Sequence, residues 1–517
     1  MKRIFTLAVI LLLNQQLSAQ QFEWLRTPAI NFSFNPEGIG YPTASDNQGN
    51  TFVCGFKDSP LIYNDIFGNL WLLKYNAAGE LLFSRTITGT VNAYKMTVDT
   101  AGNLYIAAAY IDEISIDDLH ITTSFQGVKP ILLKFSSNGD LLWSKTIGGE
   151  FTEYFKALAV DSTGNVYIGY GDFLDTHIER LDSEGNSLTT INQTQVKSLS
   201  SVSVDSQGNI YAAGACAEMN VSFNGTDVVN LLPYNTYLVK YNPLGQMQWM
   251  HFEEDVTCPE PQVVARTPDE VYFSSYLNGS YTFGTIATEG PVGGGGTDFF
   301  LAKLNANGEY QWVKEVPGNG EVQLGNRNFL TIDNQGNPYI AARYRGTIQW
   351  SPSISSQSLN FNNDILVLKY NPQGDVLWAK TAGGTSEDRA DGISILNDGS
   401  IILSGMAYGN VTFDALSHNT ATDFTCYPYV TKINTSTLGI PAPELNNVTV
   451  YPNPAQDFIT LNSPNYRGNA VIYSVLGQQL KKVNINTDTT AIDISTLASG
   501  TYLLRLETGQ SSKIIKL

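Results

Sequence analysis

The chain has 517 residues, with 30 Lys and Arg against 48 Asp and Glu, a formal net charge of −18, and 11% aromatic residues. This length allows two or more domains, and the acidic balance disfavours nucleic acid and anionic lipid surfaces as partners. The excess of acid lies before residue 446, because residues 446–517 carry six Lys and Arg against four Asp and Glu. No long window after residue 20 shows helical periodicity, so we expect an all-β chain.

Residues 1–19 are predicted to be a secretory signal peptide. Basic Lys2 and Arg3 precede an apolar run, and the segment ends on small residues at Ala19. Such a segment directs export and is too short for a stable membrane span. No later stretch is apolar enough to cross a bilayer, so we expect export to the periplasm and no transmembrane segment.

Two sequence phrases alternate through residues 20–438. The first reads DSTGNVYIG at 161–169, and the second reads ILLKFSSNGDLLWSKT at 131–146. Further copies of the first phrase begin at Asp46, Asp99, Asp205, Thr267, Asp333 and Asn397, and of the second at Trp71, His177, Tyr237, Phe299 and Ile365. Each phrase consists of two runs rich in β-branched and aromatic residues around a polar turn, which predicts a hairpin. Two hairpins per repeat, spaced roughly 45 to 65 residues apart, predict the four strands of a propeller blade.

The two ends of this region complement each other. The seventh copy of the second phrase, from Tyr429, lacks its Trp-containing strand, whereas FEWLRTPA from Phe22 matches LLWSKTIGG from Leu141. We therefore predict a seven-bladed β-propeller of four-stranded blades over residues 20–438. Its N-terminal strand would complete the last blade and leave no exposed sheet edge. A solenoid is the alternative, but it leaves the strand at Trp24 unexplained.

The pattern changes after a proline-bearing linker at 439–445. Alternating strands separated by Pro-Asn-Pro and Gly turns predict a small C-terminal β-sandwich over residues 446–517. The alternative to a specialised domain is an ordinary sandwich used for binding.

This tail resembles a known export domain. Its YPNP opening, LGQ turn, SGTYLLRL run and final Lys-rich strand are similar to the C-terminal sorting domain of type IX secretion substrates in Bacteroidota. The resemblance implies that the type IX secretion machinery is a partner through residues 446–517. It also implies a secreted or outer cell-surface location after passage through the periplasm, and cleavage of the tail with release or surface attachment.

The repeat resembles the bacterial SBBP-type β-propeller repeats. The matching elements are DSTGNVYI, LLKFSSNGDLLWSKT and the Gly pair at Gly148 and Gly149. This resemblance implies the propeller fold, and the family has no uniform biochemical activity.

The search for catalytic chemistry yields no candidate catalytic residue, metal site or cofactor. The four histidines have no metal-ligand spacing, and neither a hydrolase elbow nor a phosphate loop occurs. The Asp of each DxxGN phrase has the oxygen chemistry of a calcium ligand, but an Asp that caps its own turn explains it as well. The second phrase contains a recurrent aromatic residue, which either binds a ligand or packs one blade against the next. The residues at this position are Trp24, Phe83, Trp143, Trp249, Trp312 and Trp378.

Four cysteines follow the signal segment and allow two disulfides in an exported protein. The predicted topology places Cys216 and Cys258 on one face of neighbouring blades, and Cys54 and Cys426 in the two blades that meet at the closure. We therefore consider the bridges Cys216–Cys258 and Cys54–Cys426, with free buried thiols as the alternative.

A ligand site is expected on the face formed by the loops between strands b and c and between strands d and a, near the axis, because variable loops on a rigid scaffold carry most binding sites. The alternative for each of these residues is an ordinary solvated loop position. The candidates are Tyr41, Tyr94, Lys156, Ser200, Pro261, Asn328 and Asp391 at the starts of the inner strands, and the adjoining Glu153, Tyr154, Arg327, Glu387, Asp388 and Arg389.

Three functions fit these observations. The first is a non-catalytic exported protein that binds an unknown glycan, peptide or surface ligand, and this is our prediction. The alternatives are a lyase or hydrolase acting on polysaccharide or peptide, and a structural surface protein.

Overall fold

The computed structural model describes most of the chain and divides it into two compact units, Met1–Ser436 and Thr437–Leu517. None of the described residues forms a helix long and apolar enough to cross a membrane. The predicted signal peptide and the linker at 439–445 lie outside the described residues. The described ranges are 20–32, 39–58, 61–63, 65–123, 127–149, 154–231, 235–254, 260–291, 297–359, 362–435, 449–463, 467–474, 478–506 and 511–517.

The first unit repeats an antiparallel group of four strands, named a to d from the axis outward. In the first three groups, β6 is shared as strand d of one group and strand a of the next. These strands are β2 (Thr43–Ser45), β3 (Thr51–Phe56), β5 (Asp65–Tyr75), β6 (Leu81–Val98), β7 (Leu104–Ile116), β9 (Val128–Phe135), β10 (Leu141–Thr146), β11 (Tyr154–Val160), β12 (Val166–Gly171), β13 (Thr176–Leu181) and β14 (Ser187–Thr194).

The next groups follow the same order, with β27 (Glu321–Leu324) as an additional partner of β29. The fourth and fifth groups are β15 (Ser198–Val204), β16 (Ile210–Cys216), β19 (Asn235–Tyr241), β20 (Met247–Glu254), and β21 (Gln262–Thr267), β22 (Glu270–Leu277), β25 (Asp298–Leu304), β26 (Tyr310–Glu315). The last two are β28 (Leu330–Ile332), β29 (Pro338–Arg345), β32 (Asp364–Tyr370), β33 (Val376–Gly384), and β34 (Arg389–Ile395), β35 (Ile401–Tyr408), β38 (Cys426–Asn434), β1 (Gln21–Arg26).

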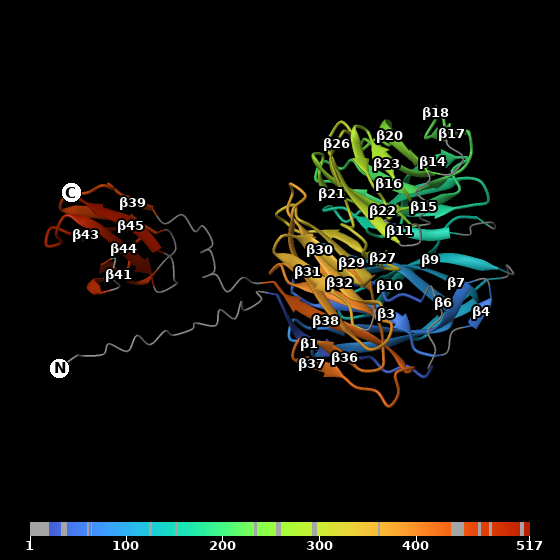
Figure 1. The fold of residues 1–517 in the computed structure, drawn as a ribbon, viewed down its shortest axis with the longest axis horizontal. Coiled ribbons are helices and arrows are strands. Elements are labelled where there is room, and N and C mark those ends of the chain that lie inside the picture. The colour runs from blue at the N-terminus through green and yellow to red at the C-terminus, as the bar shows by residue number, and fades with distance from the viewer. Residues whose placement is uncertain are drawn as a thin grey trace, which may run out of the picture. The chain divides into compact units, whose positions relative to one another are not determined.

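The inner strands contact one another in a closed cycle. Contacts run from β2 to β6, β11, β15, β21, β28 and β34, and from β34 back to β2. The chain is therefore an all-β protein with a β-propeller. Figure 1 follows this order by colour, and the first and last long strands of the unit, β1 and β38, lie side by side.

Strand β1 is the outermost strand of the sheet β1–β38–β35–β34. Its Phe22 packs edge-on against Phe413, with ring centroids 5.1 Å apart. The Phe22 backbone N–H donates to Asp414 Oδ2 at 3.1 Å, and Thr431 Oγ1 donates to the Trp24 carbonyl at 2.7 Å. Residues separated by about four hundred positions are thus joined by backbone pairing, side-chain packing and hydrogen bonds.

In five of the groups, the recurrent aromatic of strand d contacts the following group. It packs on the glycine of the following group's c–d turn, where an added Cβ would lie within 2.6 to 3.4 Å of the ring. These pairs are Trp24 on Gly79, Phe83 on Gly139, Trp143 on Gly185, Trp249 on Gly308 and Trp312 on Gly374. Four of the indoles also donate a hydrogen bond of 2.9 to 3.1 Å to a carbonyl of the same turn. The predicted packing between groups is confirmed for these five aromatics, whereas the ring of Trp378 lies 5.9 Å from that of Tyr339 in its own group.

The Asp of the DxxGN phrase caps its own turn. Asp161 Oδ1 accepts from the backbone N–H of Thr163 at 2.9 Å and of Asn165 at 3.0 Å, and its Oδ2 accepts from Asn165 Nδ2 at 2.9 Å. Gly164 in the same turn has φ of +86°, which glycine adopts without strain. The same hydrogen bonds form around Asp46, Asp99, Asp205 and Asp333. This confirms the turn interpretation of the motif.

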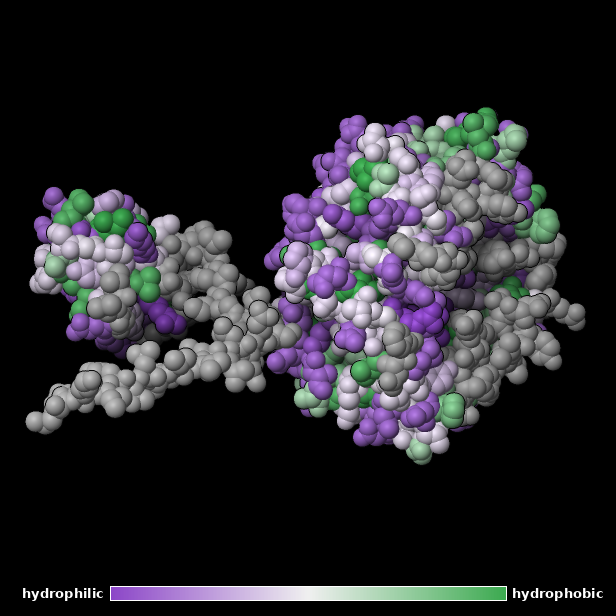
Figure 2. All heavy atoms as spheres, viewed as in Figure 1, coloured by the Kyte–Doolittle hydropathy of each residue, from purple (hydrophilic) through white to green (hydrophobic). Residues whose placement is uncertain are grey.

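Short hairpins that the sequence analysis did not predict follow several of the b strands. They are β17 (Asn220–Phe223) with β18 (Thr226–Val229), β23 (Tyr281–Phe283) with β24 (Ile286–Thr288), β30 (Thr347–Ser351) with β31 (Ile354–Gln357), and β36 (Val411–Phe413) with β37 (Leu416–His418). Strand β4 (Leu61–Tyr63) pairs with β5, and β8 (Leu119–Thr122) pairs with β7. Figure 2 shows hydrophobic side chains gathered over β17 and β18, where Val229 is 61% exposed.

The C-terminal unit contains two antiparallel sheets with one shared core. Side chains from both sheets, such as Ile459, Ile472 and Leu504, are fully or almost fully buried in that core. The sheets are β39 (Thr449–Tyr451), β40 (Phe458–Asn462), β43 (Thr489–Asp493), and β42 (Gln479–Ile485), β41 (Gly468–Ser474), β44 (Gly500–Leu506), β45 (Ser511–Lys516).

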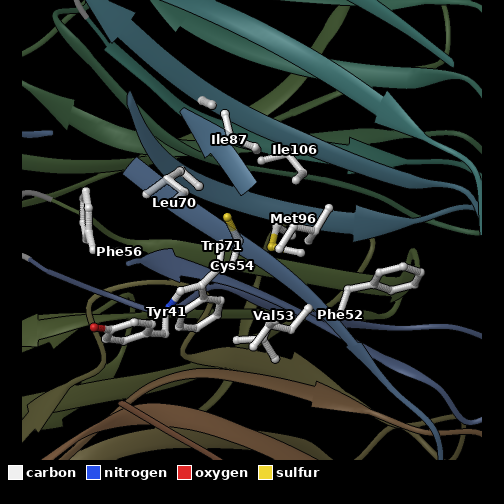
Figure 3. Packing of buried hydrophobic residues seen from close by; sticks show 14 of the residues in the cluster. Tyr41, Phe52, Val53, Cys54, Phe56, Leu70, Trp71, Ile87, Met96 and Ile106 are labelled. Carbon is white, nitrogen blue, oxygen red and sulfur yellow. The ribbon is translucent and has the colours of Figure 1, made fainter. Parts of the chain in front are cut away.

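The bridge considered between Cys54 and Cys426 is wrong, because both are free thiols. Both side chains are buried in the same apolar cluster, and Figure 3 shows the Cys54 sulfur near Trp71 and Met96. Burial raises the pKa of Cys54 to about 12 and that of Cys426 to about 11. Cys216 is also free, and its considered partner Cys258 lies outside the described residues.

Candidate functional site

Side chains from several groups meet where the inner strands begin, on the face of the d–a and b–c loops, and we call this cluster of Tyr94, Lys156, Glu260 and Arg327 the mouth. Tyr94 of β6 has the Arg327 guanidinium 5.6 Å from its ring centroid and the Lys156 ammonium 5.9 Å from it. Arg327 precedes β28 and Lys156 lies on β11, so residues far apart in the sequence converge on one tyrosine. Arg327 also lies against Gly40, where a Cβ would be 2.7 Å from Arg327 Cγ, so no larger residue fits there without displacing the arginine.

A second set of charges lies beside Tyr94. Lys156 Nζ forms an ion pair with Glu260, which precedes β21, and each side chain is 32% exposed. Burial favours the neutral acid, but Lys156, Arg327 and Lys95 outweigh it and hold the pKa of Glu260 below its usual value. Burial lowers the pKa of Lys95 to about 8, although Glu260 acts in the opposite direction.

Arg389 and Asp391, at the start of β34, form a buried ion pair at the same end of the ring. Arg389 Nε lies 3.0 Å from Asp391 Oδ1, and the guanidinium also donates to the Ile39 carbonyl before β2. The Asp391 backbone carbonyl accepts from the Arg327 N–H at 2.9 Å. This pair therefore joins the last group to the first and holds Arg327 in place.

Two predicted ligand residues are fully buried, and a third bonds to the backbone of neighbouring strands. Tyr41 and Asp391 are 0% exposed, and the Tyr41 ring stacks on Trp71 with centroids 5.7 Å apart (Figure 3). Asn328 Nδ2 donates to the carbonyls of Thr43 at 3.2 Å and Ile393 at 2.6 Å, linking neighbouring inner strands. Because Tyr41 and Asp391 have no exposed surface, their predicted contact with a ligand is corrected to a role in the scaffold. Asn328 is partly exposed, and its contact with a ligand stays a prediction.

Ser200 and Pro261, two further candidates, form a contact between neighbouring inner strands. Ser200 is 3% exposed, and its Oγ donates to the Pro261 carbonyl at 2.7 Å. Glu153 and the side chain of Tyr154 lie outside the described part of the structure.

A groove of about 650 Å³ opens on the same loop face, between the groups of β29 and β35. Amide, carboxylate and guanidinium groups line it together with an aromatic ring. The lining includes Gln323, Arg343, Asn362, Asn363, Glu387 and Phe424. The Phe424 side chain is 86% exposed, which is unusual for a residue of this size.

Two carboxylates accept hydrogen bonds from backbone N–H groups: Asp388 lines the groove, and Asp364 directly follows the lining residue Asn363. Asp388 accepts from the N–H groups of Gly384 and Tyr408, each at 3.0 Å, and Asp364 accepts from the Leu359 N–H at 2.8 Å. Burial raises the pKa of Asp364 to about 6 and raises that of Asp388 well above its usual value. Both groups are therefore placed to fix loops rather than to face a ligand.

The sequence analysis missed Lys95, Glu260, Asn362, Asn363 and Phe424. Lys95 directly follows the predicted Tyr94, and a check of both neighbours of each inner-strand start would have found it. The groove residues lie in loops without a repeated phrase, so no sequence signal marked them. No group of three or more His, Cys, Asp and Glu side chains that could hold a metal ion occurs among the described residues.

Residues 449–517 match the family described as Secretion system C-terminal sorting domain. This unit therefore targets the protein to the type IX secretion system and to a secreted or outer-surface location. The match covers the C-terminal unit only.

Curated relatives are similar over parts of their length. The chain is 25% identical over 424 residues to an uncharacterized WD repeat-containing protein of Acanthamoeba polyphaga mimivirus, covering 62% of this chain and 30% of that protein. It is 37% identical over 68 residues to Beta-agarase A of Zobellia galactanivorans, covering 13% of this chain and 12% of the agarase. The chain thus spans less than a third of the length of either relative.

Solved structures are similar to much of the chain at low sequence identity. A catalytically inactive virginiamycin B lyase from Staphylococcus aureus covers 79% of this chain and is itself covered to 99%, with 8% identity and a TM-score of 0.39. The Dos1 propeller covers 81% and is covered to 96%, with 12% identity and a TM-score of 0.39. PorZ, a surface component of the type IX secretion system of Porphyromonas gingivalis, covers 92% and is covered to 70%, with 10% identity and a TM-score of 0.26.

Proposed function

We propose that this protein is an exported, non-catalytic binding protein whose seven-bladed propeller presents a ligand site on the loop face. The closed cycle of inner strands supports the blade number, and the pairing of β1 with β38 supports closure by the N-terminal strand. The two packed sheets at the C-terminus support a sandwich for the sorting domain, in the region that matches that family.

The groove beside Phe424 carries this proposal. Its volume of about 650 Å³ is in the range of ligand sites. Asn362 and Asn363 offer amide donors and acceptors, which complement hydroxyl groups, and Phe424 offers an apolar face for the carbon skeleton of a ligand. This combination favours a polyhydroxylated ligand, so a glycan is the first partner to test and a peptide the second.

The experiment is a glycan and peptide array probed with the purified protein, followed by titration of each hit. Phe424→Ala should weaken binding of the hit at least about fivefold, because an aromatic anchor commonly contributes more than about 1 kcal/mol. Phe173→Ala is the matched control, since Phe173 is 74% exposed on a b–c loop of another group. Equal affinity of the two variants would move the site away from the groove.

The alternative is an enzyme that uses carboxylates of the loop face. Glu387 lines the groove next to Asp388, and Asn363 Nδ2 donates to Glu387 Oε2 at 2.5 Å. Release of product from an array-positive polysaccharide by the unmutated protein, and its loss in Glu387→Gln, would favour this alternative over binding alone.

A further inference from the structure

The third group of strands, β11 to β14, lacks the hairpin that follows strand b in other groups. Its strands β12 and β13 are joined by a turn at 172–175, in which the Asp172 N–H donates to the Asp175 carbonyl at 2.9 Å. Both strands and this turn lie within the described range 154–231. The third group therefore places no element where other groups place a hairpin.

Elsewhere in the ring, this hairpin pairs with the end of strand d of the preceding group. Strand β17 pairs with β14 at 193–194, β36 pairs with β33 at 383–384, and the extension of β7 pairs with β6 at 87–89. When the d strands are aligned by their pairing with strand c, these positions correspond to residues within 147–149, at the end of β10. Three contacts between groups thus include a strand that the contact between the second and third groups does not have.

A cavity of about 490 Å³ lies at this contact, and we call it the cleft. Its lining includes Gly148 after β10, and Asp172, His177, Glu179 and Thr190 of the third group. Strand β10 is an end strand of its sheet and pairs with β9. The cleft therefore joins a sheet edge to polar side chains of the next group.

His177 takes the place of the aromatic residue on which other hairpins pack. By its pairing with strand b, it corresponds to Tyr237, Phe300 and Tyr429. Each of these rings contacts a hairpin phenylalanine, with centroids 4.6 to 5.5 Å apart; the phenylalanines are Phe223, Phe283 and Phe413. The cleft is thus the counterpart of a hairpin site, with an imidazole in place of the apolar ring.

The charged groups of the cleft lie beside one another in pairs. Lys145 Nζ is 3.3 Å from Glu179 Oε1, and His177 Nε2 is 3.3 Å from Asp172 Oδ2. A carboxylate has about four lone-pair sites, so both acids can accept a further hydrogen bond. An uncharged side chain that donates a hydrogen bond suits this cleft better than a phenyl ring.

We propose that the cleft binds an extended peptide segment of a partner protein, which adds as a strand to the edge at 147–148 and places an Asn, Gln, Ser or Thr side chain over His177. Strand addition uses main-chain hydrogen bonds for affinity and side-chain pockets for selectivity. Strand β17 shows the geometry, because its Phe223 lies opposite Gln193, the counterpart of Ile147, and its ring contacts Tyr237. This inference goes beyond the proposed function, because it does not require the groove beside Phe424.

The test is a phage-displayed library of random short peptides, selected on the full exported chain, followed by fluorescence polarisation of the synthetic hits. We expect hits that bind the unmutated protein and do not bind Thr190→Trp, because the indole fills the cleft from an exposed position of β14. Thr189→Trp is the matched control. Thr189 is an exposed neighbour on the opposite side of the same strand, at the position of Trp143 in β10, and its replacement should leave binding intact.

Two further measurements separate strand addition from other contacts. A bound hit should protect the backbone amides of 141–149 from hydrogen exchange, because the new strand pairs with that edge. Replacing the polar residue of a hit by Phe should weaken its binding to the unmutated protein, and His177→Phe should restore that binding. Phe424→Ala should not alter binding of any of these peptides, which separates the cleft from the groove.

Three results would overturn the proposal. One is a library that gives no hit, and another is a set of hits that all bind Thr190→Trp as tightly as the unmutated protein. The third is a hit that depends on Thr190 but gives no protection at 141–149, because such a peptide does not add as a strand.

Discussion

Replacing Trp24 by Ala tests whether the ring is closed by its N-terminal strand. Trp24 is 5% exposed, and its Nε1 donates to the Ala77 carbonyl at 3.1 Å, in the turn that follows β5. Its ring lies on Gly79 of the same turn, where a Cβ would be 2.6 Å from Trp24 Cδ2. The residue thus bonds the last group of strands to the first.

The expected loss follows from this burial. Truncating a buried Trp to Ala costs about 3–5 kcal/mol, including the cavity that it leaves. The indole hydrogen bond is a small part of that loss, because net hydrogen-bond contributions are about 1 kcal/mol and water can reach the partly buried turn. The free energy of unfolding should therefore fall by about 3–5 kcal/mol.

Trp312→Ala is the matched control. Trp312 has the same place in an internal group, with Nε1 donating to the Pro372 carbonyl at 3.0 Å and the ring on Gly374. Urea unfolding followed by circular dichroism should give similar losses for the two variants. If Trp24→Ala leaves the midpoint unchanged while Trp312→Ala lowers it, the closing strand does not stabilise the ring and the reasoning is refuted.

Three further predictions concern stability and export. Burial raises the pKa of Glu253 to about 7, so the folded state takes up a proton and its stability falls as the pH rises from about 4.5 to 7. Glu253→Gln should stabilise the protein at pH 8 by up to about 3 kcal/mol, and the gain should disappear near pH 4 in urea titrations. Arg389→Ala leaves the buried Asp391 carboxylate without its ion pair and should cost about 3–5 kcal/mol, with a smaller loss in Arg389→Lys; equal stability of all three proteins would contradict this role. Removing residues 446–517 should leave a folded propeller in the periplasm, as measured by fractionation and protease resistance, and normal surface delivery would contradict the export role.

Local chemistry made much of the scaffold predictable. The Asp161 turn needs only residues within four positions, so its phrase carries the full set of hydrogen-bonding groups. The Trp24 motif has the same strand context as its copies, and the structure gives it the same packing on a turn glycine. The repeats are informative because copies of one phrase form the same turn hydrogen bonds and the same packing contacts.

The mouth and the groove could be predicted only in part, because their residues meet through the ring. Lys95 and Glu260 interact electrostatically although 165 positions separate them, and no periodic signal links the two positions. Tyr41 illustrates the opposite error. Its place at the start of an inner strand suggested exposure, but the ring turns into the core and stacks on Trp71.

The short hairpins after the b strands could also have been predicted, because their turns follow a repeated sequence pattern. Their turns contain residues with positive φ, namely Asp117, Asn224, Gly284 and Asp414. Each turn sits between short apolar segments such as VSF and VTF, so a third repeated phrase was present in the sequence.

The pairing of β1 with β38 also has a consequence for the order of folding. The Trp24 carbonyl and Thr431 Oγ1 are separated by 407 positions, whereas the strands within one group are neighbours in sequence. Loop-closure entropy grows with the logarithm of length, so joining these ends costs only about 2 kcal/mol more than closing a loop of roughly 60 residues. The contacts of Trp24 outweigh that entropy, but they form only after β38 has been released into the same compartment. The ring should therefore exist first as an open arc with an unpaired edge at β38, and sealing should be its last folding step.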